Sequence, residues 1–511
     1  MNPKTQLARN LAPVLDWAKK NKPRVQQGRS EPDVSGFVAV GDMSFRSVAE
    51  PTETETPFEL PAEFTGKDYL TMLLHIDAEI EHGLMLQYLY AAYSLGGPQI
   101  PEDYRSKIHQ WQDIILGISK EEMGHFISVQ NVLKLMGVPL NFGRESYPWD
   151  TPFYPFPFYL EPLTLDSLAK YVYAEAPSKW LDSNDPVAKD VKARVHATVS
   201  DPHTVGALFK IILALVKDPK YIPDDVFQPG TYPFQAKFDE WGRSYSGGQR
   251  GGAHIASFNT SPDVLVAPLT SRDDAYNALY EIAEQGEGED HSEGAVPSHF
   301  ERFLYIYKEW SAIPQKTGTP WSPSRNIALN PYVAPATGAD PDSSDSSEGM
   351  TNDEQSDAIT HPETRLWGNL FNIRYRMLLN YLNHSFLLDN GYNQAGARAP
   401  RGLIINSTFG EMYNLRSIAT AMVQMPLSAK DNKKMAGPPF TIPYTLDLPF
   451  GEPNRWRLHA DLLVEARNII TELKAIKGQT LLNYLDSLQE LDDKMLDTIA
   501  RMTDVEACWN K

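Results

Sequence analysis

A glutamate and a histidine stand three residues apart inside an apolar helical pattern. Between residues 102 and 136, apolar side chains recur every three or four positions, and Glu122 and His125 occupy two of those positions. A buried carboxylate is costly unless a partner compensates its charge, and a divalent metal is such a partner. Glu-x-x-His on a bundle helix is the ligand spacing of di-iron carboxylate proteins. A buried ion pair is the alternative, and the adjacent Glu121 is expected to be solvated. The stripe consists of Ile108, Trp111, Ile115, Ile118, Glu122, His125, Val129, Val132 and Met136.

A further carboxylate faces inward on the preceding helical segment. Glu81 shares a helix face with Leu84, Met85 and Tyr88, whereas Glu79 falls on another face. Tyr88 lies two turns from Glu81 on the same side, where its phenol can hydrogen-bond a metal ligand or take part in redox chemistry. Ordinary core contact is the other interpretation of Tyr88.

The elements that must position these residues are long helices. Capping residues, apolar periodicity and Gly/Pro stops predict a mainly α fold built around a four-helix bundle over residues 66–315. The prolines of residues 147–163 forbid a regular helix, and the aromatic residues there predict a loop that packs onto the bundle. The expected helices are 65–95, 102–136, 164–175, 203–217, one from about 271 that breaks near Gly286, and 298–310.

The rest of the chain divides into three parts. Residues 1–65 predict an extended N-terminal arm, and residues 334–358 an acidic, serine-rich flexible linker. Residues 359–511 predict a second helical region, with amphipathic segments at 359–390, 407–425 and 455–503. Dispersed acids and histidines on such helices are mostly caps and solvated residues, so they are assigned no chemistry. These residues are His384, Glu411, His459 and Glu465.

Composition excludes several classes of function. The 511 residues carry a net charge of −19, which disfavours nucleic acid as a partner. The longest aliphatic run, Ile211 to Val216, is too short to span a membrane, and the first residues lack the apolar stretch of a secretory signal. A single cysteine, Cys508, means that a bound metal must use histidine and carboxylate ligands. We therefore predict a cytoplasmic protein that acts on a small molecule and is able to form a homo-oligomer.

Several strings resemble a known family. The segments EIEHGLMLQYLYAAYSL at 79–95 and KEEMGHFISVQNVLKLMG at 120–137 are similar to the ferritin-like domain of the iminophenyl-pyruvate dimer synthases of violacein and rebeccamycin biosynthesis. The aromatic loop, EAP at 175–177, TVGALF at 204–209, EQGEG at 284–288 and SHFERF at 298–303 extend the resemblance over about residues 65–310. The resemblance implies a ferritin-like bundle and a role in oxidative coupling of imines derived from aromatic amino acids. The metal ligands that it implies are Glu81, Glu122, His125, Glu284, Glu287 and His299.

One position departs from this family pattern. Where the family usually has a glutamate in the TVGALF string, this chain has Ala207. Glu175 is a substitute ligand or else a solvated carboxylate at a helix end. Glu287 is preferred to Glu284 because it lies nearer His299 along the chain.

Two functions follow as hypotheses. The first is an iron-dependent oxidative enzyme with one or two non-haem ions, using oxygen or peroxide on an aromatic, amino-acid-derived substrate, with the aromatic loop as a pocket wall. The second is a metal-free coupling enzyme or a scaffold in a biosynthetic assembly, which Ala207 supports. Iron storage ranks last, because a storage cage has no need of the long second region.

Overall fold

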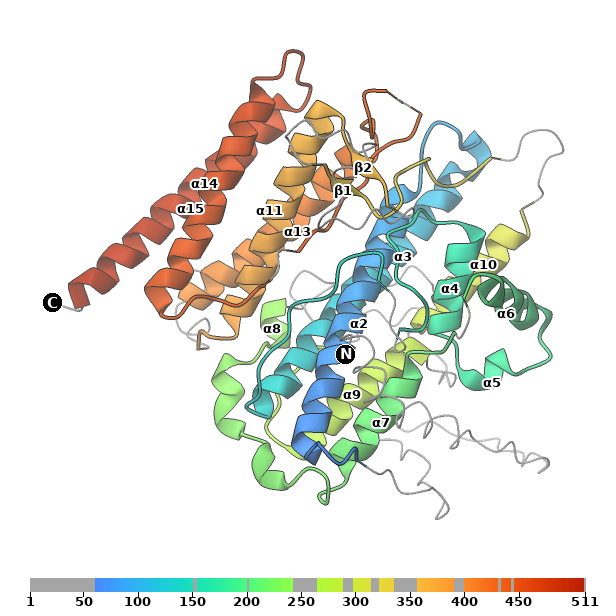
Figure 1. The fold of residues 1–511 in the computed structure, drawn as a ribbon, viewed down its shortest axis with the longest axis vertical. Coiled ribbons are helices and arrows are strands. Elements are labelled where there is room, and N and C mark those ends of the chain that lie inside the picture. Colours follow the sequence, from blue (N-terminus) through green and yellow to red (C-terminus); the bar gives the residue numbers. More distant parts are fainter. Residues whose placement is uncertain are drawn as a thin grey trace, which may run out of the picture.

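The computed structural model is mainly helical (Figure 1). It describes residues 60–149, 154–199, 202–241, 264–287, 297–313, 321–334, 356–389, 399–430, 433–442 and 445–509. The predicted N-terminal arm and acidic linker fall almost entirely outside these residues. The longer helices are α2 (Gly66–Ser94), α3 (Glu102–Leu135), α4 (Leu165–Ala174), α6 (Pro186–Thr198), α7 (Gly206–Lys217), α9 (Arg272–Glu287), α10 (His299–Ser311), α11 (Pro362–Ser385), α13 (Pro400–Met422), α14 (Glu452–Lys474) and α15 (Leu482–Trp509).

Helices α2 and α3 form the central pair of the bundle. Thr65 caps α2 by accepting a hydrogen bond from the backbone N–H of Asp68 at 3.2 Å. The chain leaves α3 at Gly137, whose positive φ of 64° suits a residue without a Cβ. The two helices pack against each other along their length, and every residue of the predicted α3 stripe is buried. Both predicted spans are confirmed to within one residue.

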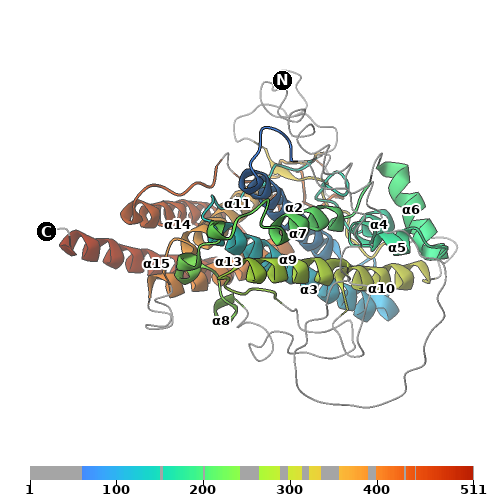
Figure 2. The same cartoon turned by 90° about the horizontal axis from the view of Figure 1, so that it is seen from below.

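The other two helical rods of the bundle are each divided in two. Helices α4 and α7 follow one another along the bundle, and so do α9 and α10 (Figure 2). Helix α7 packs on α9 and α2, while α4 packs on α10. The backbone N–H of Val205 donates to Ala174 O at 3.1 Å, which joins the end of α4 to the start of α7. Two helices that the sequence analysis left out, α5 (Ser178–Leu181) and α6, lie between α4 and α7.

The C-terminal helices pack directly on the bundle. Buried residues of α11 and α13 belong to the same hydrophobic cluster as those of α2 and α3. Helix α11 contacts α13 and α14, and α14 contacts α15 (Figure 1). The predicted segment 455–503 is thus two helices, α14 and α15, separated by a turn at Gly478, where φ is 83°. The division into an N-terminal arm, bundle, linker and C-terminal region stays a prediction.

The shorter elements connect these helices. Strands β1 and β2 pair in parallel on either side of the predicted linker. No helix among the described residues is long and apolar enough to cross a lipid bilayer. The short elements are the 3₁₀ helices η1 (Asp224–Val226) and η2 (Pro229–Phe234), helix α8 (Phe238–Trp241), and the strands β1 (Tyr332–Val333) and β2 (Ala358–Ile359).

The prediction of solvated acids and histidines in the C-terminal region is wrong for three of its four residues. His384, Glu411 and His459 are buried, and only Glu465 is exposed. The buried residues have partners on other helices that replace water. His384 lies 2.9 Å from His459 through their ring nitrogens, and Glu411 accepts a hydrogen bond from Arg374 at 3.0 Å.

The aromatic loop packs onto the bundle, as predicted. The ring of Phe158 lies over Gly83 of α2 so closely that an added Cβ would come within 2.5 Å of it. The hydroxyl of Tyr147 donates to the carbonyl oxygen of Gly83 at 2.8 Å. The described part of this loop therefore covers the outside of α2, and it does not line the cavity that holds the inward carboxylates.

Candidate metal centre

Five predicted ligands meet in one small cavity at the centre of the bundle. The cavity measures about 20 Å³, enough for ions or one small molecule but not for an aromatic ring. Helix α2 contributes one ligand, α3 two, the C-terminal end of α4 one and the first residue of α10 one. All are buried. The five residues are Glu81, Glu122, His125, Glu175 and His299.

The first donor group joins α2 to α3. His125 Nδ1 lies 3.3 Å from Glu81 Oε2 and 3.1 Å from Glu122 Oε2. One donor atom from each of the three residues lies within 4.8 Å of the others, which is close enough to hold a single ion. The helical repeat explains the Glu122–His125 pair, because residues at i and i+3 project from the same face. The predicted inward orientation of Glu81 is thus what the structure has.

The second donor group shares Glu122 with the first. His299 Nδ1 lies 2.8 Å from Glu122 Oε1 and 4.0 Å from Glu175 Oε1. Glu122 therefore directs one oxygen to each histidine, and the two imidazoles stack with ring centroids 5.3 Å apart. Two three-residue groups that share one carboxylate have the ligand types and the layout of a two-metal site.

The atoms between the two groups fit a cation. His299 Nδ1 and Glu122 Oε1 are close, but their orientation does not make a hydrogen bond, so within the described residues each lacks a hydrogen-bond partner. Because buried polar atoms are nearly always satisfied, two such atoms directed at one point are what a cation site provides. Carboxylate and imidazole donors suit iron and other divalent metals.

Outer hydrogen bonds fix both histidines with Nδ1 toward the cavity. His299 Nε2 lies 3.0 Å from Glu121 Oε2, and His125 Nε2 lies 2.7 Å from Gln285 Oε1. With a metal bound at Nδ1, the Nε2–H group of each histidine would be the donor to this outer oxygen. A carboxylate or amide behind a histidine is the usual support of a metal ligand.

The expectation that Glu121 is solvated is wrong. Glu121 is fully buried and makes an ion pair with Arg302 of α10. Although burial opposes ionisation, Arg302 and His299 lower the pKa of Glu121 to about 2. Glu121 directly precedes the inward Glu122, and the helical pattern assigns it to solvent because the sequence does not reveal that α10 covers this face. Gln285 and Arg302 carried no sequence signal of this role.

Glu175 is buried and lines the cavity beside α7, the helix that lacks a carboxylate. It ends α4 at the junction with α7, and Tyr88 Oη donates to Glu175 Oε1 at 2.6 Å. A Cβ added at Gly286 would lie 3.1 Å from Glu175 Oε2, so this glycine leaves room for the carboxylate. Glu175 thus reaches the cavity from a neighbouring helix end, and the alternative of a solvated carboxylate is wrong.

The carboxyl groups of the site have unequal pKa values in the absence of metal. Burial and the charge of Glu122 raise the pKa of Glu81 well above its usual range. Burial works in the same direction at Glu122, but His299 and His125 overcome it and hold the pKa of Glu122 well below normal. Burial and Glu122 also raise the pKa of Glu175 to about 7. Unequal pKa values of this kind are common at functional sites.

Asp77 is a further acid that the sequence analysis missed. It lies one helical turn before Glu81, and both of its carboxylate oxygens are buried and lack a partner among the described residues. Burial raises the pKa of Asp77 to about 8, and the charges of His125 and Glu122 also act on it. The i, i+4 spacing to Glu81 was the available signal.

Two further candidates lie on α9, and the structure describes the side chain of one of them. Glu284 is exposed and lies beside Tyr280, whose pKa is raised to about 12 by burial and by this carboxylate. Glu287 is the last residue of α9, and its side chain lies outside the described residues. The preference for Glu287 over Glu284 therefore stays a prediction.

Fold and site together define a class of protein, and sequence comparison agrees with it. Residues 74–308 match the Ferritin-like family model, and this range contains all five cavity ligands. This part of the chain is a ferritin-like domain, in which the third and fourth helical rods are divided at the level of the donor groups.

Two curated proteins from natural-product biosynthesis confirm the resemblance seen in the sequence. The chain is 26% identical over 437 residues to dichlorochromopyrrolate synthase of Lentzea aerocolonigenes, covering 77% of this chain and 37% of that protein. It is 31% identical over 144 residues to 2-imino-3-(indol-3-yl)propanoate dimerase of Chromobacterium violaceum, covering 23% of this chain and 14% of that protein. The chain thus spans little more than a third of the length of the first relative. No solved structure gives a significant match.

Proposed function

We propose that this protein is an iron-dependent oxidative enzyme that couples small imines derived from an aromatic amino acid. The observation that supports the metal most strongly is the pair of buried donor groups that share Glu122. The printed names of the two relatives, a synthase and a dimerase of an indolyl imine, support the substrate class. Both matches cover a minor part of those longer proteins, so activity and substrate are inferences for this chain.

The protein side chains would bind, orient and shield the iron. Glu81, Glu122 and Glu175 offset the charge of the ions, while Glu121 and Gln285 hold the two imidazoles with Nδ1 inward. Bound iron with an open position supplies electron exchange with oxygen or peroxide. Burial of the five side chains would limit their contact with bulk water, and Tyr88 holds Glu175 in place through its hydroxyl.

The coupling is an oxidation that requires an acceptor. Joining two imine or enamine units through a new carbon–carbon bond removes two electrons and two protons. Hydrogen peroxide accepts them to give two molecules of water, or dioxygen accepts them to give hydrogen peroxide. Because the cavity is too small for an aromatic ring, the organic substrate would react from outside the donor groups.

The second candidate is a metal-free coupling enzyme or scaffold. Ala207 favours it, as does the way Glu122 already lies against both histidines. A bare scaffold should tolerate the loss of a buried carboxylate, whereas a metal enzyme should not.

The decisive experiment measures iron and product together. Protein is reconstituted anaerobically with ferrous iron and desalted, and its retained iron is quantified. The same protein is then supplied with oxygen, L-tryptophan and an amino-acid oxidase that generates the imine. We expect retained iron and a coupled dimer by mass spectrometry, and loss of both in Glu122→Ala. Glu284→Ala removes an exposed glutamate of the same domain and should change neither. Equal product from chelator-treated protein would contradict iron dependence.

A further inference from the structure

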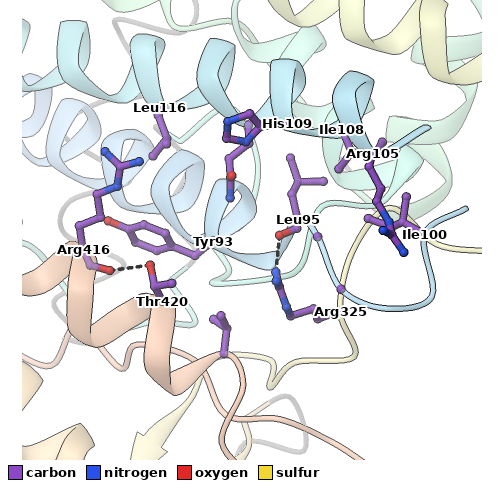
Figure 3. Close-up of a pocket in the computed structure, with 14 residues that line it drawn as sticks. Tyr93, Leu95, Ile100, Arg105, Ile108, His109, Leu116, Arg325, Arg416 and Thr420 are labelled. Carbon is purple, nitrogen blue, oxygen red and sulfur yellow. Dashed lines mark hydrogen bonds between the residues drawn. The ribbon is translucent and has the colours of Figure 1, made fainter. Parts of the chain in front are cut away.

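Two adjoining cavities lie on the face of α2 and α3 that is turned away from the metal centre. One is an apolar cavity of about 190 Å³ between α2, α3 and the C-terminal helices α11 and α13. The other is a cleft of about 360 Å³ at the end of α2, between α3 and α13 (Figure 3). They meet at three residues that line both, namely Tyr93, Leu116 and Arg416. No described residue lines both this space and the metal cavity.

The cleft is cationic in a strongly acidic protein. Its lining includes Arg105, Arg325, Arg416 and His109, and none of the described residues that line it is acidic. In Figure 3, Arg416 lies at one end of the cleft beside Tyr93, and Arg105 and Arg325 lie at the other end. Neither Arg105 nor Arg416 has an ion pair within the described part of the chain. A chain with a net charge of −19 contains many acidic residues that could pair with these arginines. Arginines that have no acidic partner among the described residues therefore favour the binding of an external anion.

The apolar cavity supplies a surface suited to an aromatic ring. Its walls include the rings of Phe126, Tyr375, Phe409 and Phe440, and its other lining residues are mostly leucine and methionine. Methionine and aromatic side chains adapt to flat apolar ligands and make favourable ring contacts. The cavity has the mostly apolar lining and few polar groups that are typical of small-molecule sites.

The charged residues that line the apolar cavity are both cations, namely Lys120 and Arg416. An anionic group on the ligand would be attracted to them.

We propose that the joined cavities bind a small aromatic carboxylic acid, with the ring in the apolar cavity and the carboxylate against Arg416. Inorganic phosphate fits the cleft less well, because the apolar cavity opens directly beside the guanidinium and only an amphipathic ligand fills both parts. The site lies outside the metal centre and the proposal does not depend on iron. A ligand here would bridge the bundle and the C-terminal helices.

Binding of indole-3-acetate, measured by isothermal titration calorimetry, tests this site. Indole-3-acetamide has the same ring and nearly the same size but no charge. We expect saturable binding of the acetate, and about tenfold weaker binding of the acetamide, because a charge-assisted hydrogen bond to a guanidinium is lost. Equal affinities for the two probes, or no saturable binding of the acetate, would overturn the proposal.

Matched variants locate the probe. Arg416→Gln should weaken the acetate about tenfold and leave the acetamide unchanged, whereas Arg457→Gln removes an exposed arginine of α14 and should alter neither. Met412→Trp, at a partly buried position, should fill the apolar cavity and weaken both probes, with the fold checked by circular dichroism. If Met412→Trp does not fold, the Arg416 and acetamide results decide alone. An acetate affinity that is unchanged in Arg416→Gln would refute the site.

Chelation separates this proposal from the proposed function. Indole-3-acetate should bind with the same affinity before and after treatment with a chelator, because the cavities share no lining residue among those described. Loss of binding on chelation would place the probe at the metal centre, which overturns this site and leaves the iron proposal intact.

Discussion

Two buried ionic clusters, one in the bundle and one in the C-terminal helices, compensate their carboxylates in different ways. In the C-terminal cluster, Arg374 Nη1 lies 2.8 Å from Asp492 Oδ1 and 3.0 Å from Glu411 Oε1, and Nη2 also contacts Asp492. The guanidinium is always charged and its planar donors match two carboxylates. This cluster joins α11, α13 and α15, and its three residues line none of the cavities found among the described residues.

The bundle cluster lacks such a permanent cation. Asp77, Glu81, Glu122 and Glu175 contact no lysine or arginine among the described residues, and the nearest positive groups are the two imidazoles. Their Nδ1 atoms point into a cavity. The difference shows that burial of charge alone does not identify a metal site. A candidate metal site also needs carboxylates without a permanent cation and imidazole nitrogens that are directed into one cavity.

Loss of Arg374 should have the largest effect on stability. Arg374→Met leaves Glu411 and Asp492 buried without their cation, which should lower the free energy of unfolding by about 3–5 kcal/mol. Urea denaturation followed by circular dichroism measures this. Lys494→Met, which breaks an exposed pair with Glu490 on α15, is the control and should leave the denaturation midpoint nearly unchanged. Similar losses in the two variants would show that the buried cluster is not structural.

Because the bundle cluster has no permanent cation, the stability of the metal-free protein should depend on pH. Asp77 has a folded-state pKa of about 8, above its unfolded value near 4, so its protonated form favours folding. That contribution is complete below about pH 4 and is lost as the pH rises toward 8. Chemical denaturation of chelator-treated protein between pH 5 and 8 should show falling stability.

Asp77→Asn provides the control for this slope. It should stabilise the metal-free protein at pH 8 relative to wild type, by an amount on the order of a few kcal/mol, and have little effect near pH 4. A variant whose pH dependence parallels that of wild type would mean that Asp77 ionises normally in the folded protein.

Removal of one hydroxyl should give the smallest effect. Tyr88→Phe deletes the hydrogen bond to Glu175 and should cost about 1–2 kcal/mol, because the acceptor is a buried carboxylate. Tyr171 is the matched control, since its ring lies 4.9 Å from that of Tyr88 and its hydroxyl has no partner within the described residues. Tyr171→Phe should be nearly neutral by thermal denaturation. An equal loss in both variants would argue against a positioning role for Tyr88.

Periodicity predicted the parts of this protein that lie on continuous helices. Glu81, Glu122 and His125 could be placed inward because each lies on a long helix whose apolar stripe is unbroken. The start of α2 could be predicted from the capping residue Thr65, and the end of α3 from Gly137. These features depend on neighbours within four residues, which the sequence displays directly.

The missed features all depend on contacts between distant segments. Glu175 lies at a helix end, and only the junction of α4 with α7 shows that it is covered. Glu121 required Arg302 from a helix far along the chain, and Glu411 required Arg374 and the packing of α13 on α11. The local pattern therefore assigned Glu121 and Glu411 to solvent and left Glu175 open between a ligand and a solvated carboxylate, because it does not show the distant partners that stabilise a buried charge.

Anomalous diffraction at the iron absorption edge, from crystals of protein reconstituted with ferrous iron, tests the account most directly. We predict two peaks in the bundle cavity that share Glu122, one next to Nδ1 of His125 and the other next to Nδ1 of His299. A folded protein whose cavity shows no anomalous density, with Glu122 hydrogen-bonded to both imidazoles, would contradict the assignment of a metal centre.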